Sequence, residues 1–310
     1  LFKTLLCEGF FYSIISSYLN CFLYKFDNSF MKASIQHILF SFIAFSFTYG
    51  ISYLTKIELV NYAIVLSFLF QWMLFIPAYF LQTEKFFDIS GSFNFIIITS
   101  FIYYNSFIEY GFNLGNLVLS FLIIIWAVRL GSFLFYRIKK DGEDKRFREI
   151  KPYPAKFFMT WTLQGTWVSI CSLCAITGMS ADKGIIINPL FYLGLVIFIL
   201  GFAIEVIADY QKTKFRKNPK NKNHFITSGL WSYSRHPNYL GEISLWTGIA
   251  IISFSSLSDW QYISLISPIF IYMLLVHISG INFLEASSNK KWGHLQTYQD
   301  YIKKTPKLLF

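Results

Sequence analysis

Charged residues are scarce in this chain. Of its 310 residues only 14% are charged, whereas 55% are hydrophobic and 21% are aromatic. A soluble globular domain carries about 25% charged residues, so the composition excludes that class and predicts a membrane protein. Nucleic acid is a poor candidate partner, because the basic segments are short and are attached to long apolar runs.

Cysteine is also rare, with four in the chain. Cys171 and Cys174 form a C-x-x-C pattern inside an apolar run, with no second pair and no histidine at metal-binding spacing. Cys7 and Cys21 lie too far apart on one predicted helix to be read as a disulfide. We therefore expect no structural metal and no disulfide, and we interpret Cys171 and Cys174 as small core residues.

Apolar runs long enough to cross a bilayer fill most of the chain. A transmembrane helix needs about 20 mainly apolar residues, and we predict eight or nine such spans, the first of them marginal because Glu8 interrupts it. The candidate spans are 5–24, 33–54, 59–81, 93–110, 113–137, 157–177, 185–210, 238–257 and 261–284. No long polar stretch separates them, so we expect an all-α, polytopic transmembrane helical bundle that forms one membrane domain, 1–310.

The net charge of +10 is concentrated in three segments. These segments are 137–156, 212–235 and the tail after 290, and an even number of predicted spans separates each from the next. All three should therefore lie on one side, which the positive-inside rule makes the cytosol or the mitochondrial matrix. We expect an integral protein of the endoplasmic reticulum or of the mitochondrial inner membrane.

Acidic residues are missing from 211–241, where a basic loop leads into the densest polar stretch of the chain. Pro237 is a favourable first residue for a helix, so Arg235 and His236 should precede a helix of about 237–254. The N–H groups at a helix N-terminus favour phosphate. Basic charge alone would also fit a purely topological role, but that role does not explain the lack of acids beside the predicted helix start.

A second polar face is predicted at the end of the helix of about 189–215. Glu205, Asp209, Lys212 and Arg216 recur at spacings of four, three and four, so they share one face. They could form ion pairs that cap the helix end. We favour a functional role, because carboxylates in membrane helices usually point into a bundle or cavity.

The stretch Gly229–Glu242 resembles the signature of the steroid 5-alpha-reductase C-terminal domain family. Its Gly-Leu-Trp, Ser-Arg-His-Pro-Asn-Tyr and Gly-Glu elements are most similar to the branch known as domain of unknown function 1295. Sterol C14-reductases and isoprenylcysteine methyltransferases are more distantly similar. Further similar landmarks are Phe87-Asp88, Arg129-Leu130-Gly131, Asp144-Lys-Arg-Phe147, Glu205-Val-Ile-Ala-Asp-Tyr-Gln-Lys212 and Tyr298-x-x-Tyr301. The resemblance covers 86–310, while 1–85 match poorly, as N-terminal helices only.

This resemblance implies a reductase that uses NADPH to reduce a carbon–carbon double bond conjugated to a ketone. The substrate would be a lipid or a steroid-like molecule entering from the bilayer. A buried tyrosine or glutamate would supply the acid, and Glu84 and Tyr104 are residues of the required kind. The positions implied to line the cofactor are Arg235, His236, Asn238, Tyr239, Glu242, Asp209, Lys212, Glu205, Arg129, His294 and Tyr298.

Several alternatives stay open. Arg129 could extend to the membrane interface, and His294 and Tyr298 could belong to an amphipathic interfacial helix. Asp144, Arg146 and Phe147 are second-rank candidates. The chain could instead be an S-adenosylmethionine-dependent lipid methyltransferase. It could also be a non-catalytic, reductase-like subunit of a large membrane complex, such as a mitochondrial respiratory complex, with an unused cofactor or none.

Overall fold

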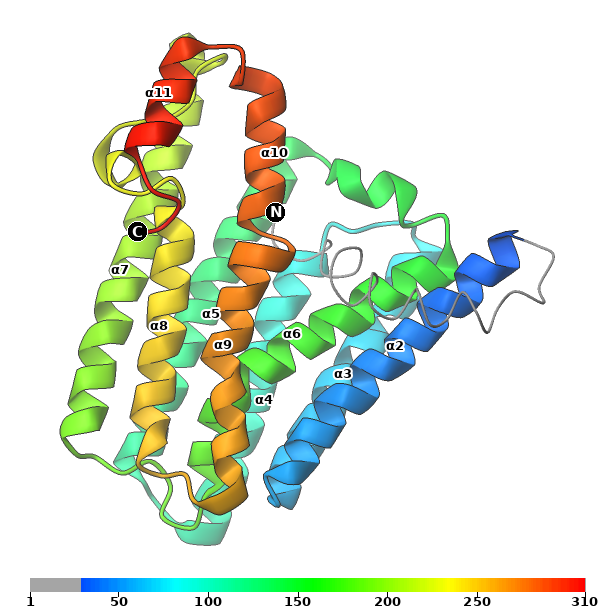
Figure 1. Cartoon of the computed structure of the whole chain (residues 1–310). Coiled ribbons are helices and arrows are strands. Elements are labelled where there is room, and N and C mark those ends of the chain that lie inside the picture. The colour runs from blue at the N-terminus through cyan, green and yellow to red at the C-terminus, as the bar shows by residue number, and fades with distance from the viewer. Residues whose placement is uncertain (1–28, 310) are drawn as a thin grey trace. The chain divides into compact units, whose positions relative to one another are not determined.

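The computed structural model describes residues 29–309, which contain helices and no strand. The predicted span 5–24 lies outside the described residues. The long helices are α2 (Ser29–Leu54), α3 (Glu58–Phe80), α4 (Phe87–Tyr110), α5 (Leu114–Asp141), α6 (Pro154–Ser180), α7 (Pro189–Lys217) and α8 (Pro237–Phe254), and the shorter ones are α9 (Ile266–Met273), α10 (Ile281–Trp292) and α11 (Gln296–Lys304) (Figure 1). The all-α prediction is confirmed for this part of the chain.

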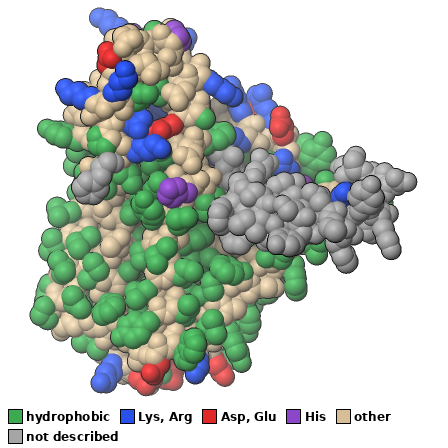
Figure 2. Space-filling view, viewed as in Figure 1, with side chains coloured by type: hydrophobic (Ala, Val, Ile, Leu, Met, Phe, Trp, Pro, Cys, Tyr) green, Lys and Arg blue, Asp and Glu red, His purple; other side chains and the backbone are tan. Residues whose placement is uncertain are grey.

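Five stretches of the described chain are long and apolar enough to cross a membrane. They are Met31–Leu54, Glu58–Phe80, Leu114–Asp141, Pro189–Lys217 and Asp259–Trp292. In Figure 2, hydrophobic side chains are frequent over the lower part of the face on which α7 and α8 lie. The findings fit a membrane helical bundle, and the count of eight or nine spans is not confirmed.

The chain divides into two compact units. Unit 1 runs to Ile187 and also contains Ser253–Ser267, and unit 2 contains Asn188–Ile252 and Pro268–Phe310. This division does not follow the boundary near residue 86 at which the family resemblance begins. The single membrane domain over 1–310 stays a prediction.

Helix α6 is the centre of unit 1 and is buried on all sides from Met159 to Ser180. A helix that has no solvent-facing or lipid-facing side must pair its polar groups inside the protein. The Ser169 hydroxyl accordingly lies 3.1 Å from the Ser67 hydroxyl of α3, which also accepts a 3.0 Å hydrogen bond from Asn94 of α4. These bonds connect three helices through their buried faces.

In unit 2, glycines allow α7 and α8 to pack with their backbones in contact. A Cβ atom on Gly241 would lie 2.6 Å from the Glu205 nitrogen, and one on Gly201 would lie 2.6 Å from the Leu245 nitrogen. Only glycine permits so close an approach of two helix backbones. Helix α7 thus occupies the space beside Gly241.

The predicted span 261–284 is not one regular helix. The chain forms a 3₁₀ segment (Asp259–Leu265), then α9, a π-helical turn (Leu274–Ile278) and α10. A π turn inserts an extra residue into the helix and often lies beside a functional site. Here the interruption precedes α10, which carries Glu285.

Candidate functional site

The segment that carries Arg235 is held in place by α7 and by the C-terminal tail. Trp231 is buried, and its indole N–H donates a 3.1 Å hydrogen bond to the Ala208 carbonyl of α7. The Arg235 N–H donates to the Pro306 carbonyl at 2.9 Å, and the Ser234 hydroxyl donates to the Lys307 carbonyl at 3.2 Å. The side chains of Arg235 and His236 are therefore presented from a segment with both flanks fixed.

These bonds bear on the segment just before the predicted anion site at the start of α8, and the site itself stays a prediction. The N–H groups of Arg235 and His236 do not point outward, because Pro306 accepts from the first and the Ser234 hydroxyl accepts from the second at 3.2 Å. Backbone N–H groups at these two positions are thus already used within the protein. At Arg235 and His236, the groups left to attract an anion are the side chains.

Those side chains gather around one carboxylate, that of Glu285 on α10. Arg235 Nη1 lies 2.9 Å from Glu285 Oε1, His236 Nε2 lies 3.4 Å from the same oxygen, and Lys307 Nζ lies 3.9 Å from Oε2. The side chains of Arg235 and Glu285 are only 14% and 18% exposed. We call Arg235, His236, Glu285 and Lys307 the cationic cluster.

Positive charge exceeds negative charge in the cationic cluster, and one of its donors is unused. The buried Nε of Arg235 has no hydrogen-bond partner in the part of the chain that the structure describes. Lys212 adds a further positive charge from α7, with its ammonium 4.5 Å from the centre of the Trp231 ring. A buried guanidinium with a free N–H is suited to a phosphate group, because its planar fork of N–H donors can bind two phosphate oxygens at once.

Burial is the main cause that lowers the pKa of His236 below its usual value. The positive charges of Lys212 and Arg235 lower the pKa further, and the hydrogen bond to Glu285 opposes them. His236 is therefore neutral at neutral pH and can act as a hydrogen-bond donor or acceptor. Its ring stacks on Tyr239, with the ring centres 5.8 Å apart and an angle of 13° between the planes.

The remaining predicted residues of α7 and α8 also lie in unit 2. Glu205, Asp209 and Glu242 are buried, and Asn238 is half-buried. Buried ionisable groups in apolar helices are costly and mark functional sites more often than structural ones. Their predicted contacts with a cofactor stay predictions.

The C-terminal helix α11 packs its tyrosines inward. Tyr298 is buried, with its ring centre 5.1 Å from that of Phe225. Tyr301 donates a 2.6 Å hydrogen bond to the Trp231 carbonyl, and burial raises its pKa to about 12. His294 is exposed in the turn before α11. Tyr298 and Tyr301 thus fasten the tail to the segment that carries Arg235, while His294 does not take part in this packing.

The other predicted residues belong to unit 1. The guanidinium of Arg129 lies 5.3 Å from the centre of the Phe133 ring, and Tyr104 is 63% exposed. Glu84 is buried, forms an ion pair with Lys151 and accepts a 3.0 Å hydrogen bond from the Asp144 N–H. This pairing weakens the case for Glu84 as a proton donor, since its carboxylate already holds a loop.

The stretch Asp144–Phe147 has a structural role in that loop. Asp144 pairs with Arg146, and Phe147 is buried 5.1 Å from the Phe87 ring of α4. Burial alone would raise the pKa of Asp144, but the hydrogen bonds from Arg146 outweigh it and the pKa is lowered. These second-rank candidates therefore fasten the loop after α5 to the start of α4.

Sequence reasoning missed Glu285 and Lys307. A single local signal pointed to Glu285, because it is the only acidic residue between Asp259 and Asp300 and directly follows the predominantly apolar run 261–284. An isolated carboxylate beside such a run is a reason to search for a cationic partner. Lys307 had no signal of this kind in the basic tail.

Three relatives show what this chain resembles. It is 33% identical over 109 residues to the probable O-methyltransferase ustE of Ustilaginoidea virens, and this match covers 30% of this chain and 38% of that protein. It is 28% identical over 137 residues to 3-oxo-5-alpha-steroid 4-dehydrogenase 2 of Homo sapiens, 42% of this chain and 51% of that protein. It is 27% identical over 132 residues to Delta(14)-sterol reductase TM7SF2 of Mus musculus, 38% of this chain and 29% of that protein.

The chain thus spans about half the length, or less, of these three relatives. No solved structure matches it. The family described as "Protein of unknown function (DUF1295)" matches residues 74–305, which include the cationic cluster except Lys307. The chain belongs to the DUF1295 family, as the landmarks around Arg235 predicted.

Proposed function

We propose that the protein is a membrane-embedded, NADPH-dependent reductase of a conjugated carbon–carbon double bond in a lipid or steroid-like substrate. The observation that carries the proposal is the cationic cluster with the free Nε of Arg235. The names of the human and mouse relatives, a steroid dehydrogenase and a sterol reductase, support the reaction class. The apolar helices support a substrate that enters from the bilayer.

The residues of unit 2 fit a dinucleotide. Arg235 and Lys307 would bind phosphate by charge, and His236 would lie beside it. Asn238 and Tyr239 carry an amide and a phenol that suit a carboxamide or ribose hydroxyl. The basic loop 212–222 favours NADPH over NADH, because only NADPH carries a 2′-phosphate. When bound, the cofactor supplies the hydride.

The proposal assigns binding residues and leaves the proton donor unassigned. Glu84 is engaged by Lys151, and Tyr104 is largely exposed. Tyr301 stays protonated at neutral pH but uses its hydroxyl to bind the Trp231 carbonyl. The proton must therefore come from another side chain or from water.

A second candidate is an S-adenosylmethionine-dependent methyltransferase. The observation that favours it is the 33% identity to the probable O-methyltransferase. The surplus of positive charge around Arg235 favours the phosphates of a dinucleotide over the sulfonium cation of S-adenosylmethionine. We therefore place it second.

Binding of the two cofactors to the full-length protein in detergent distinguishes these functions. We expect NADPH to bind and to be displaced by NADP⁺ but not by S-adenosylmethionine. Arg235→Gln should weaken NADPH binding at least about tenfold, as expected for loss of a charge-assisted phosphate contact. Lys140→Gln removes the same charge from an exposed position at the end of α5 in unit 1, outside the proposed site, and should change binding little. Equal loss in both variants would refute the site, and binding of S-adenosylmethionine alone would establish the second candidate.

A further inference from the structure

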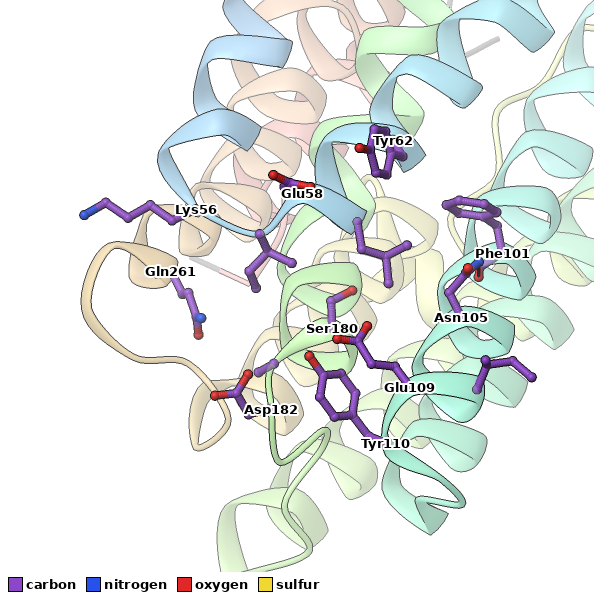
Figure 3. A pocket seen from close by; sticks show the side chains of 14 residues that line it. Lys56, Glu58, Tyr62, Phe101, Asn105, Glu109, Tyr110, Ser180, Asp182 and Gln261 are labelled. Atoms are coloured by element: carbon purple, nitrogen blue, oxygen red, sulfur yellow. Dashed lines mark hydrogen bonds between the residues drawn. The ribbon is translucent and has the colours of Figure 1, made fainter.

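A cavity of about 520 Å³ lies within unit 1, at the helix ends remote from the Glu84–Lys151 ion pair. Its wall contains Glu58, the first residue of α3, Tyr110, the last residue of α4, and Ser180, the last residue of α6 (Figure 3). Its volume is typical of a small-molecule site. The proposed dinucleotide site in unit 2 does not use any of these residues.

The cavity is strongly acidic. Three carboxylates line it, those of Glu58, Glu109 and Asp182, and none of them forms an ion pair within residues 29–309. The one lysine in the wall, Lys56, extends away from them in Figure 3, and its ammonium lies 5.8 Å from the centre of the Trp260 ring. Helices α4 and α6 end at this cavity and α3 begins there, so two of the three helix termini attract positive charge.

A second, independent observation points to a ligand. Ser180 is 4% exposed, and its hydroxyl has no hydrogen-bond partner among the described residues. Buried polar groups almost always have a partner, and exceptions require an explanation. Because Ser180 lines the cavity, a bound polar group would supply the missing hydrogen bond.

The lining distinguishes between kinds of cation. Within the described residues no three metal-binding side chains are close enough to hold one ion. Tyr62, Tyr110 and Phe101 contribute aromatic rings to the wall, and such rings attract organic cations. The Ser180 oxygen and the carboxylates accept hydrogen bonds, which a primary ammonium can donate and a quaternary ammonium cannot.

We propose that this cavity binds a protonated primary amine. Glu109 and Asp182 would bind its charge, and the Ser180 hydroxyl would accept one N–H. Ethanolamine phospholipid and a small free amine share this chemistry. The proposal does not depend on the proposed reductase function.

The test uses the full-length protein exposed to equal amounts of phosphatidylethanolamine, phosphatidylcholine and phosphatidylglycerol. The retained lipid is measured by native mass spectrometry. We expect ethanolamine lipid to be retained about tenfold over choline lipid, which has the same charge without N–H groups. The double variant Glu109→Gln/Asp182→Asn should lose this preference, while Glu149→Gln, an exposed acid outside the cavity, should keep it. Equal retention of the three lipids with no amine bound, or an unchanged preference in the double variant, would overturn the proposal.

Two further arms complete the test. Free ethanolamine at millimolar concentration is added to protein that holds ethanolamine lipid. Displacement indicates that the amine alone is recognised, and retention indicates that the lipid is the ligand. Ser180→Ala should lower the retention several-fold and leave the melting temperature without ligand unchanged, since its hydroxyl has no partner to lose. Unchanged retention of the ethanolamine lipid in Ser180→Ala would refute binding of the amine in this cavity.

Discussion

Replacing Glu285 with glutamine tests whether the cationic cluster holds unit 2 together. The Arg235–Glu285 contact is 2.9 Å long, and both side chains are less than one-fifth exposed. Removing one partner of such a pair leaves a poorly solvated charge, and we expect each of Glu285→Gln and Arg235→Gln to cost about 2 kcal/mol. In a chain of this size that is roughly a 4 °C decrease in melting temperature.

The double variant Arg235→Gln/Glu285→Gln separates the pair from its surroundings. If the two side chains stabilise each other, the double variant should lose much less than the sum of the single losses, with a coupling energy of about 2 kcal/mol. The assay is thermal unfolding in detergent at one fixed scan rate, because such scans depend on rate. Glu143→Gln is the control, since its pair with Arg148 is largely exposed and should contribute nothing measurable. Additive losses would refute the reasoning.

Three other predictions concern single residues. The pKa of His236 is lowered in the folded protein, so its contribution to stability should be complete above pH about 6.5 and decrease as the pH falls through the lower pKa of the folded state. His236→Asn should remove this part of the pH dependence of the melting temperature, and an unchanged pH profile would contradict this prediction. Gly241→Ala should destabilise by about 2 kcal/mol or more, because the new methyl group meets the α7 backbone, whereas Gly50→Ala, with open space around it, should be tolerated. Phe147→Ala should lower the free energy of unfolding by about 3 kcal/mol by leaving a cavity beside Phe87. A loss below about 1 kcal/mol would show that the packing of Phe147 against Phe87 does not form a stabilising core.

Local patterns predicted the elements of the fold well where one helix has clear start and stop signals. The prediction of a helix over 237–254 agrees with α8, because Pro237 marks its first turn. The predicted face of Glu205, Asp209 and Lys212 lies on one continuous helix, α7. The π turn after α9 was missed, because an extra residue in a helix leaves no mark in an apolar run.

The site was predicted in part. Arg235 and His236 were identified by their place beside a helix start in an acid-free stretch, and the structure brings them together with Glu285. The partners were missed because they come from residues about 50 or more positions away in the chain. Glu84 shows the same limit, since its pairing with Lys151 across 67 positions gives a catalytic-looking carboxylate a structural role.

In the proposed function, the cationic cluster holds the phosphates of a nicotinamide dinucleotide. Mass spectrometry of the gently purified full-length protein, with the small molecules released on unfolding, tests this most directly. We predict NADPH or NADP⁺ in wild-type protein and its loss from Arg235→Gln but not from Lys140→Gln. S-adenosylmethionine or its demethylated product in place of the dinucleotide, or no dinucleotide retained even after incubation with NADPH, would contradict the claim.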